Sequence, residues 1–249
     1  MSPASGPDAE GRIPWPPLVE GTLIRRYKRF LADMRLTDGR QVTAHCANSG
    51  RMTACCLPGR PVYLTRHDRP ERKLKFTWEM IRMPTSLVGV NTQIPNRLVA
   101  AAIAGGRIPA LRGYDSIRRE VRLGTGTRLD LLLEGVGRRP CYVEVKNCTL
   151  VVDGIARFPD APTARGRKHL ETLAAQPGER CRRVNFFLVQ RVDAAGFEPA
   201  DDIDPEYGRA LRSAVGRGVE LMAWDVELNT RWIGLNRPVD IGLPGPQAV

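Results

Sequence analysis

The sequence lacks any apolar run long enough to cross a membrane. Its first residues also lack the succession of a basic and an apolar stretch that marks a secretory signal. These two absences argue against a membrane-spanning protein and against a secreted one. We therefore expect a cytoplasmic protein that has no membrane partner.

Cysteine is scarce as well, with 6 residues in a chain of 249. A chain of this length without a secretory signal does not depend on disulfides, so we expect reduced thiols. His45, Cys46, Cys55 and Cys56 lie close together in the sequence, but their spacing fits no common zinc motif. Structural thiols are therefore the preferred interpretation of this cluster.

Acidic residues are outnumbered by basic ones. Asp and Glu total 27 and Lys and Arg total 38, which gives a formal net charge of +11 and an isoelectric point near 9.9. Such an excess favours an anionic partner, nucleic acid first of all. The alternative is a compositional bias towards arginine without functional meaning. Hydrophobic residues make up 42% of the chain, which is enough to build a folded core.

The first third of the chain predicts a small barrel that follows a flexible tail. Residues 1–17 are rich in proline and glycine and are expected to form the tail. Between residues 18 and 85, short apolar runs alternate with turn signals such as Asp38-Gly39. The expected strands are Gly21–Tyr27, Phe30–Leu36, Gln41–His45, Pro61–Thr65 and Phe76–Ile81. So many short strands in so short a segment favour a small closed barrel.

Residues 86–249 predict a second domain of mixed α/β type. The expected elements are, in order, a helix at Arg97–Ala104, strands at Ile117–Leu123, Thr127–Leu133 and Cys141–Lys146, a helix at Thr163–Ala175, a strand at Val184–Val189, a helix at Asp204–Gly216 and a strand at Glu220–Trp224. The strand Val184–Val189 is almost entirely apolar, which is typical of burial on both faces. This succession of helices and strands indicates an α/β fold.

One strand of the second domain carries a carboxylate and an ammonium group on the same face. Alternate residues of a strand face the same side, so Glu144 and Lys146 lie side by side, while Val143 and Val145 pack inward. The tripeptide on its own is common. The simplest alternative is therefore an ion pair in which Lys146 neutralises Glu144 and has no further role.

Two turns bring further carboxylates to this face. A hairpin symmetric about Gly137 places Asp130 opposite Glu144, and a hairpin symmetric about Thr125 places Glu120 opposite Asp130. A simple meander then sets three carboxylates in a row across three strands. A slip of the register by one residue would turn these side chains to the other face.

Carboxylates opposed on a sheet repel one another, so three of them require a compensating charge. Mg²⁺ or Mn²⁺ supplies it, because a hard divalent cation binds one or two carboxylates together with water and phosphate oxygens. We expect Asp130, Glu144 and Glu120 to be metal ligands, and Asp130, Glu144 and Lys146 to form the catalytic set. Lys146 lies beside the attacking water in this hypothesis, and the set suits hydrolysis of a phosphodiester bond.

Basic residues cluster where we expect nucleic acid to bind. They lie at the start of the barrel, in a polar turn, at the end of the barrel, and on the helix near the carboxylates. These residues are Arg25, Arg26, Lys28, Arg29, Arg51, Lys73, Lys75, Arg165, Lys168 and His169. The aromatic residues Tyr27, Phe30, Tyr63, Phe76 and Trp78 are interleaved with the barrel cations. Barrels can bind single strands by stacking bases on such rings. Alternatively, the rings fill the barrel and the charges only solvate it.

Several long blocks of the sequence carry a resemblance to a known family. They are RYKRFLAD (26–33), TAHCANSGRM (43–52), RKLKFTWE (72–79), GVNTQIPN (89–96), GTGTRLD (124–130), YVEVKNCTL (142–150) and FPDAPTARGRKHL (158–170). In these blocks the chain resembles the sugar fermentation stimulation protein A family. The resemblance extends from about Leu18 to Leu243 and leaves out only the tail.

The resemblance implies an OB-like barrel at the N-terminus and a nuclease-like α/β domain of the PD-(D/E)xK type at the C-terminus. It also implies binding of single- or double-stranded DNA without strong sequence preference, and a regulatory link to sugar metabolism, including that of maltose. Asp130, Glu144 and Lys146 match the D…ExK signature of such nucleases. Glu120 matches an acidic position on the preceding strand.

One departure from the family pattern bears on catalysis. The family usually has a glutamate in the helix after Pro95-Asn96, where this chain has Ala101. The alternative is therefore a catalytically inactive DNA-binding regulator of sugar metabolism that keeps the nuclease fold. A homodimer that pairs through a sheet edge, such as the last strand, is also compatible with the sequence.

Overall fold

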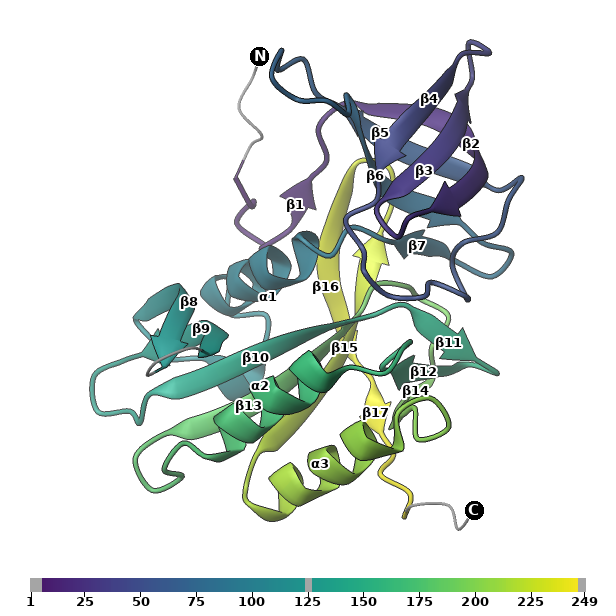
Figure 1. The fold of residues 1–249 in the computed structure, drawn as a ribbon. Helices are drawn as coiled ribbons and strands as arrows, with labels where there is room; N and C mark the ends of the chain where they lie inside the picture. Colours follow the sequence, from purple (N-terminus) through teal and green to yellow (C-terminus); the bar gives the residue numbers. More distant parts are fainter. Residues whose placement is uncertain (1–5, 124–126, 246–249) are drawn as a thin grey trace.

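The first domain is a small closed barrel, as the sequence predicts (Figure 1). The computed structural model describes residues 6–123 and 127–245. The barrel strands are β2 (Leu18–Tyr27), β3 (Leu31–Leu36), β4 (Gln41–His45), β5 (Pro61–Arg66), β6 (Phe76–Arg82) and β7 (Leu87–Gly89). They pair in the order β4-β3-β2-β5-β6-β7, and a parallel pairing of β4 with β6 closes the sheet. The five expected strands correspond to β2 through β6.

Three aromatic side chains of the barrel strands are buried. Trp78 is fully buried, and Tyr63 and Phe76 are each only 8% exposed. Trp78 and Phe76 belong to the barrel core, whereas Tyr63 packs in a smaller cluster with Met80 and Leu87. These three rings therefore offer no surface on which a base could stack. Phe30, at the tip of the β2–β3 hairpin, is 46% exposed, and the neighbouring Tyr27 is partly exposed.

The second domain is built around a mixed sheet of seven strands (Figure 1). Its strands are β1 (Ile13–Pro14), β8 (Ser116–Leu123), β9 (Thr127–Glu134), β10 (Cys141–Cys148), β13 (Arg182–Val189), β15 (Glu220–Leu228) and β16 (Trp232–Pro238). They pair in the order β1-β16-β15-β13-β10-β9-β8, in which the central strands β10, β13 and β15 run parallel. The expected α/β fold is therefore confirmed.

Helices cover both faces of this sheet and create two separate cores. On one face, α1 (Ile94–Ala104) packs on Val143 and Val145. On the other face, α2 (Ala164–Ala174) and α3 (Pro205–Gly216) pack on Cys148 and Phe187. Because both faces are covered, β10 and β13 are apolar along most of their length, as expected for buried parallel strands.

Smaller elements complete the fold and were not expected from the sequence. A second sheet contains β11 (Leu150–Val152), β12 (Ile155–Phe158), β14 (Gly196–Pro199) and β17 (Asp240–Ile241), and a 3₁₀ turn spans Pro109–Leu111. Strand β7 pairs with β6 and so belongs to the barrel sheet, although the sequence placed the domain boundary between residues 85 and 86. The structure therefore continues the barrel as far as Gly89.

The segment before Leu18 differs from the expected flexible tail. Ile13 pairs with Ile233 in β16 and is 2% exposed, and Trp15 donates its indole N–H to the Asn229 carbonyl oxygen at 2.9 Å. Burial of the Ile13 side chain in the core between α1 and the seven-stranded sheet explains why this segment is ordered. Composition alone did not reveal it, because its partner lies at the far end of the chain.

The expected last strand, which was considered for pairing two copies, has no free edge. It corresponds to β15, which lies between β13 and β16. The outer strands of the sheet are β1 and β8. All six cysteines are unpaired. Within residues 6–123 and 127–245, no helix has both the length and the apolar character needed to cross a membrane.

Candidate active site

The β9–β10 hairpin has the register that the sequence predicts. Leu131 pairs with Val143 and Leu133 with Cys141, which is the symmetry about Gly137. The ladder ends at Leu131, and the carboxylate of the preceding residue, Asp130, takes over. Its Oδ2 accepts the backbone N–H of Val145 at 2.8 Å. The side chain of Asp130 thus lies at the point where the two strands separate, next to Glu144.

Asp130 is a carboxylate in an unfavourable electrostatic setting. Its pKa is raised from 3.8 to about 6, first by burial and then by the charge of Glu144. Hydrogen bonds from Val145 N–H and from Asn96 Nδ2, the latter at 2.7 Å, and the charge of Lys146 counteract this rise only in part. A cation placed near Asp130 would therefore be strongly favoured.

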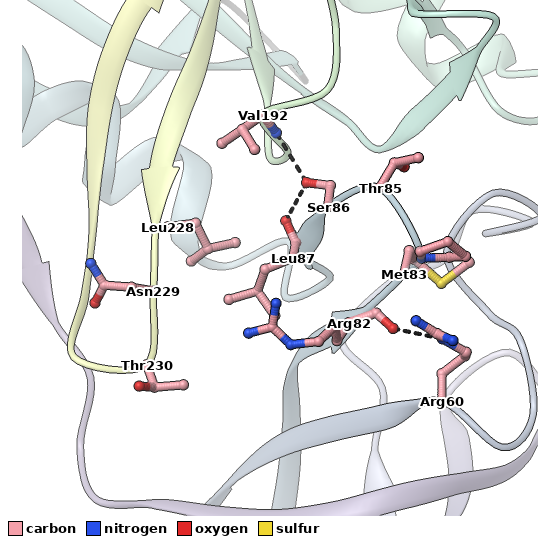
Figure 2. A pocket seen from close by; sticks show the side chains of 11 residues that line it. Arg60, Arg82, Met83, Thr85, Ser86, Leu87, Val192, Leu228, Asn229 and Thr230 are labelled. Carbon is pink, nitrogen blue, oxygen red and sulfur yellow. Dashed lines mark hydrogen bonds between the residues drawn. The ribbon is translucent and has the colours of Figure 1, made fainter.

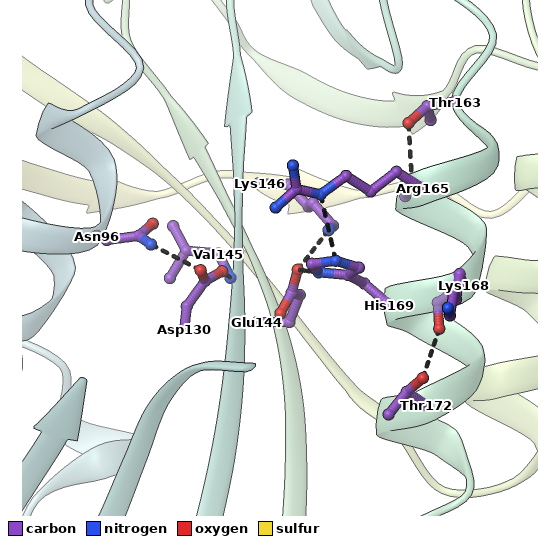
Figure 3. A network of polar contacts seen from close by, with 11 residues as sticks. Asn96, Asp130, Glu144, Val145, Lys146, Thr163, Arg165, Lys168, His169 and Thr172 are labelled. Atoms are coloured by element: carbon purple, nitrogen blue, oxygen red, sulfur yellow. Dashed lines mark hydrogen bonds and ion pairs between the residues drawn. The ribbon is translucent and has the colours of Figure 1, made fainter. Parts of the chain in front are cut away.

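Glu144 is more deeply buried but better compensated (Figure 3). Its Oε1 accepts from Lys146 Nζ and from His169 Nδ1, both at 2.6 Å. Burial alone would raise the pKa of Glu144, but the contacts with His169 and Lys146 outweigh it and the pKa is lowered. Its Oε2 is buried without a hydrogen-bond partner. An unpaired carboxylate oxygen is costly in a protein interior and marks a position that a ligand would satisfy.

Helix α2 supplies the cationic wall of the site (Figure 3). Arg165 and His169 lie one turn apart, and Arg165 Nε donates to His169 Nε2 at 3.4 Å. Both side chains line a pocket of about 310 Å³ together with Asp130 and Glu144. Lys168 was expected on the same side, but it is exposed and directed away from Glu144.

The start of α2 is fixed by a side-chain cap. Thr163 Oγ1 accepts the N–H of Gly166 at 3.0 Å, and the N–H of Thr163 donates to Asp204 Oδ2 at 2.8 Å. Asp204 in turn caps α3 by accepting the N–H of Tyr207 at 3.0 Å. The two helices are therefore tied together at their N-terminal ends, which holds His169 in register with Glu144.

Removal of this cap is expected to lower stability moderately. Thr163→Ala leaves the N–H of Gly166 without its acceptor, so the free energy of unfolding should fall by about 1 kcal/mol and Tm by roughly 2–4 °C. Thr163→Ser keeps the acceptor and serves as the control. Thermal unfolding of both variants would test the prediction, and an unchanged Tm for Thr163→Ala would contradict it.

Glu120 does not join the other two carboxylates. The β8–β9 register is as predicted, with Val121 opposite Leu129, although Thr125 at its centre lies outside the described residues. Glu120 itself has a φ of 56°, in the left-handed region. Its carboxylate pairs with Arg128 at 3.0 Å and is 51% exposed. The local backbone turn thus reduces the expected row of three carboxylates to Asp130 and Glu144.

Helix α1 contributes an amide that the sequence analysis missed. The helix begins at Ile94 and not at Arg97, so Asn96 falls in its first turn and donates to Asp130 Oδ1. Ala101, where the family pattern has a glutamate, does not line the pocket. One signal in the sequence could have indicated a role for Asn96: it and Arg97 are the only polar residues of this helix.

The pocket offers few side chains that could bind a divalent cation. Within the described ranges, no group of three or more His, Cys, Asp or Glu side chains is arranged to hold a metal. Nevertheless, Glu144 presents a carboxylate oxygen without a partner, and Asp130 presents a carboxyl group of raised pKa. Mg²⁺ commonly binds through one or two carboxylates with water completing its shell, so the chemistry of these two side chains is compatible with such an ion.

The cations expected at the start of the barrel have different positions. Arg29 lines a pocket of about 340 Å³ that adjoins the first one and also contains Lys146. Arg26 is committed to the fold, because its guanidinium donates to the carbonyl oxygens of Arg29 and Asn48 at 2.9 and 2.8 Å. Arg25 is paired with Asp33 at 2.9 Å.

The remaining barrel cations lie on the surface. Lys28, Arg51 and Lys73 are exposed. Lys75 Nζ donates to the carbonyl oxygens of Arg69 and Pro70, at 2.7 and 3.2 Å, and so stabilises the loop before β6. Of the barrel cations proposed from the sequence, Arg29 is therefore the one that the structure places in the same groove as Lys146.

A larger cavity of about 470 Å³ lies elsewhere between the two domains (Figure 2). It is lined by Arg60, Arg82, Met83, Pro84, Thr85, Ser86, Leu87, Val192, Leu228, Asn229 and Thr230. The lining contains neither a carboxylate nor a histidine. The hydroxyl of Ser86 is engaged with the Leu87 carbonyl oxygen and the Val192 N–H. This cavity therefore lacks a catalytic set.

Comparisons with known proteins agree with this architecture. The family described as "SfsA N-terminal OB domain" matches residues 24–90, and the one described as "Sugar fermentation stimulation protein RE domain" matches residues 93–232. The two matched segments cover the barrel and most of the α/β domain. The expected resemblance and the expected succession of an OB domain and an endonuclease-like domain are thus confirmed.

Individual relatives are similar over nearly their whole length. A sugar fermentation stimulation protein homolog from Geobacter sulfurreducens is 56% identical over 84% of this chain and 89% of its own. A homolog from Geotalea daltonii is 51% identical over 91% of this chain and 97% of its own. The structure of Pyrococcus furiosus SfsA in complex with Ca²⁺ is similar with a TM-score of 0.83 and 26% identity, covering 92% of this chain and 98% of that one.

Proposed function

We propose that this chain, which belongs to the sugar fermentation stimulation protein family, binds DNA and hydrolyses its phosphodiester bonds at Asp130, Glu144 and Lys146. The observation that carries the proposal is the setting of the two carboxylates. Asp130 and Glu144 line the same pocket. Glu144 Oε2 is buried without a hydrogen-bond partner, and the pKa of Asp130 is raised. Perturbed pKa values of this kind cluster at functional sites.

Asp130 and Glu144 are the residues that would hold a divalent cation, Mg²⁺ or Mn²⁺. Such a cation polarises a phosphate oxygen and lowers the pKa of bound water. The relative from Pyrococcus furiosus was solved in complex with Ca²⁺, which supports a divalent cation in this family. Glu120 is left out of our proposed ligand set, because its carboxylate is engaged by Arg128.

The other residues of the pocket have complementary roles in this proposal. The ammonium group of Lys146, 2.6 Å from Glu144, would position the attacking water and stabilise the charge that develops on the phosphate. Arg165 lines the pocket and would contact the phosphate backbone. His169 holds the carboxylate of Glu144 in place through Nδ1. The net charge of +11 supports an anionic substrate.

A cleavage assay tests the proposal. Labelled single- and double-stranded DNA should be cut by the protein with Mg²⁺ or Mn²⁺, and cutting should stop when EDTA removes the metal. Asp130→Ala should bind DNA and fail to cut it. The affinity should also fall steeply with salt because binding releases counterions. Absence of salt-dependent binding would exclude the nucleic-acid function altogether.

A catalytically inactive DNA-binding regulator is the second candidate. It is favoured by the Lys146 ion pair and the His169 hydrogen bond that already occupy Glu144 Oε1, and by the small number of metal ligands among the described residues. This candidate predicts that the wild-type protein binds DNA with the same salt dependence but leaves it intact with either metal. The cleavage assay therefore separates the two candidates directly.

A further inference from the structure

The groove at the active site continues towards the first domain. The pocket of about 310 Å³ around Asp130 and the adjoining pocket of about 340 Å³ share lining residues, among them Ser49, Thr92 and Lys146. The second pocket is also lined by Arg29 from the barrel. A ligand bound above Lys146 can therefore extend directly to the tip of the β2–β3 hairpin.

The barrel wall of this groove is held rigidly. Arg26 donates to the carbonyl oxygens of Asn48 and Gly50, at 2.8 and 3.0 Å. These bonds fix the loop that follows β4, which we call the groove loop. The N–H of Met52 donates to Asp160 Oδ2, across the domain boundary, at 3.0 Å. A Cβ at position 50 would collide with both carboxylate oxygens of Asp160, so any other residue would have to displace this side chain. The two domains thus meet in a preorganised contact beside the active site.

The hairpin tip itself is strained. Lys28 and Arg29 have φ angles of 47° and 61°, in the left-handed region that Gly, Asn and Asp adopt more readily than Lys or Arg. Neither residue suits this backbone, and strain of this kind is retained where the side chains serve a function. Phe30 follows directly, 46% exposed, and its carbonyl oxygen accepts the N–H of Cys46 at the start of the groove loop.

Arg29, which lines the groove, therefore shares one hairpin tip with the exposed side chains of Lys28 and Phe30. Cations that follow phosphates and aromatic rings that stack on bases are how proteins hold single-stranded nucleic acid. In a duplex the bases stack on one another, so a ring such as Phe30 would have no unpaired base to contact. The groove contains one further carboxylate, Asp160, and this is engaged by the loop.

We propose that the tip formed by Lys28, Arg29 and Phe30 binds the single strand of DNA that runs through the groove. Arg29 contacts a phosphate next to the one above Lys146, and Phe30 stacks on a base. This inference rests on the proposed function and specifies its substrate: single-stranded DNA in preference to duplex. The first domain is then part of the substrate site and not a separate binding module.

Binding measurements without divalent metal test this substrate preference. Fluorescence anisotropy would give the Kd of a labelled single-stranded oligonucleotide and of a hairpin duplex in EDTA, where no cleavage occurs. The wild type should prefer the single strand. Phe30→Ala should weaken single-strand binding by about 5- to 100-fold and leave duplex binding unchanged, and Phe30→Trp should restore it. Leu57→Ala, at a barrel side chain that is 48% exposed and does not line the groove, is the matched control.

Arg29→Gly separates a binding role from a structural one. Glycine is at ease in the left-handed region, so this variant should melt at the same temperature as the wild type or higher. Single-strand affinity should nevertheless fall. The slope of log Kd against log salt should decrease by about 1, which corresponds to the loss of one phosphate contact. A purely structural role for Arg29 would not produce this combination.

The outcomes distinguish the inference from the function on which it rests. Equal wild-type affinity for both DNA forms would overturn the inference, as would wild-type affinity in Phe30→Ala or in Arg29→Gly. Failure to bind any DNA would overturn the proposed function and the inference together. Binding and cleavage of duplex alone would leave the proposed function standing and overturn only the inference.

Discussion

Replacing Lys146 by methionine is expected to lower the rate of DNA cleavage by about 100-fold or more while DNA binding stays within a few fold of the wild type. The methionine side chain has a similar length but no charge, so it can neither position the attacking water nor stabilise charge on the phosphate. Single-turnover cleavage at saturating DNA isolates this effect from binding. The loss should appear with Mg²⁺ and with Mn²⁺ alike.

Lys168→Met is the matched comparison for this variant. The same chemical change is made on the neighbouring helix, at a side chain directed away from Glu144 (Figure 3). Its cleavage rate at saturating DNA should equal that of the wild type, although its affinity can be lower. If Lys146→Met cleaves within about threefold of the wild type, Lys146 has only the structural role of neutralising Glu144.

Asp130→Asn is expected to abolish cleavage and to stabilise the metal-free protein. The pKa of Asp130 is about 6 in the fold against an ordinary value of 3.8, so ionisation destabilises the folded state. The difference of about two pKa units corresponds to roughly 3 kcal/mol at a pH above 6. An amide removes this penalty and can still accept the N–H of Val145, while Asn96 can rotate to accept from the new amide N–H.

The sign of this effect reverses the usual behaviour of an aspartate. Because the pKa of Asp130 is raised on folding, the folded state holds the proton more tightly, and stability decreases as pH rises from about 4 to 6. Urea unfolding in EDTA at pH 5 and pH 8 should therefore show a larger gain for Asp130→Asn at pH 8. Glu171→Gln, at an exposed position of α2, should show no gain at either pH. An equal stability of Asp130→Asn and wild type at pH 8 would contradict the electrostatic account.

The backbone of the site was accessible to sequence reasoning because it is local. Strand alternation and two short turns determined which face Glu144 and Lys146 share and how β9 pairs with β10. The cap at Thr163 is equally local, because it joins the side chain of Thr163 to the N–H of Gly166. Each of these features depends on residues that are close together in the sequence.

The features that the sequence concealed depend on distant partners or on a single dihedral angle. The left-handed φ of Glu120 removes its carboxylate from the site, and no pattern of residue types announces it. Asn96 reaches Asp130 only because α1 packs on the sheet, and Arg26 is committed to a loop more than twenty residues away in the sequence. Whether Trp78 fills the barrel or faces solvent likewise depends on how the barrel closes.

The short strand β1 has a practical consequence for handling the protein. A chain shortened to begin at Leu18, as its composition invites, would lose the pairing of Ile13 with Ile233 and leave β16 as an unprotected outer strand. Unpaired strand edges recruit edges of other molecules. Such a shortened protein should self-associate or precipitate at concentrations at which the full chain remains dispersed. A dimer found only in truncated preparations would then be a product of the truncation and not of the native protein.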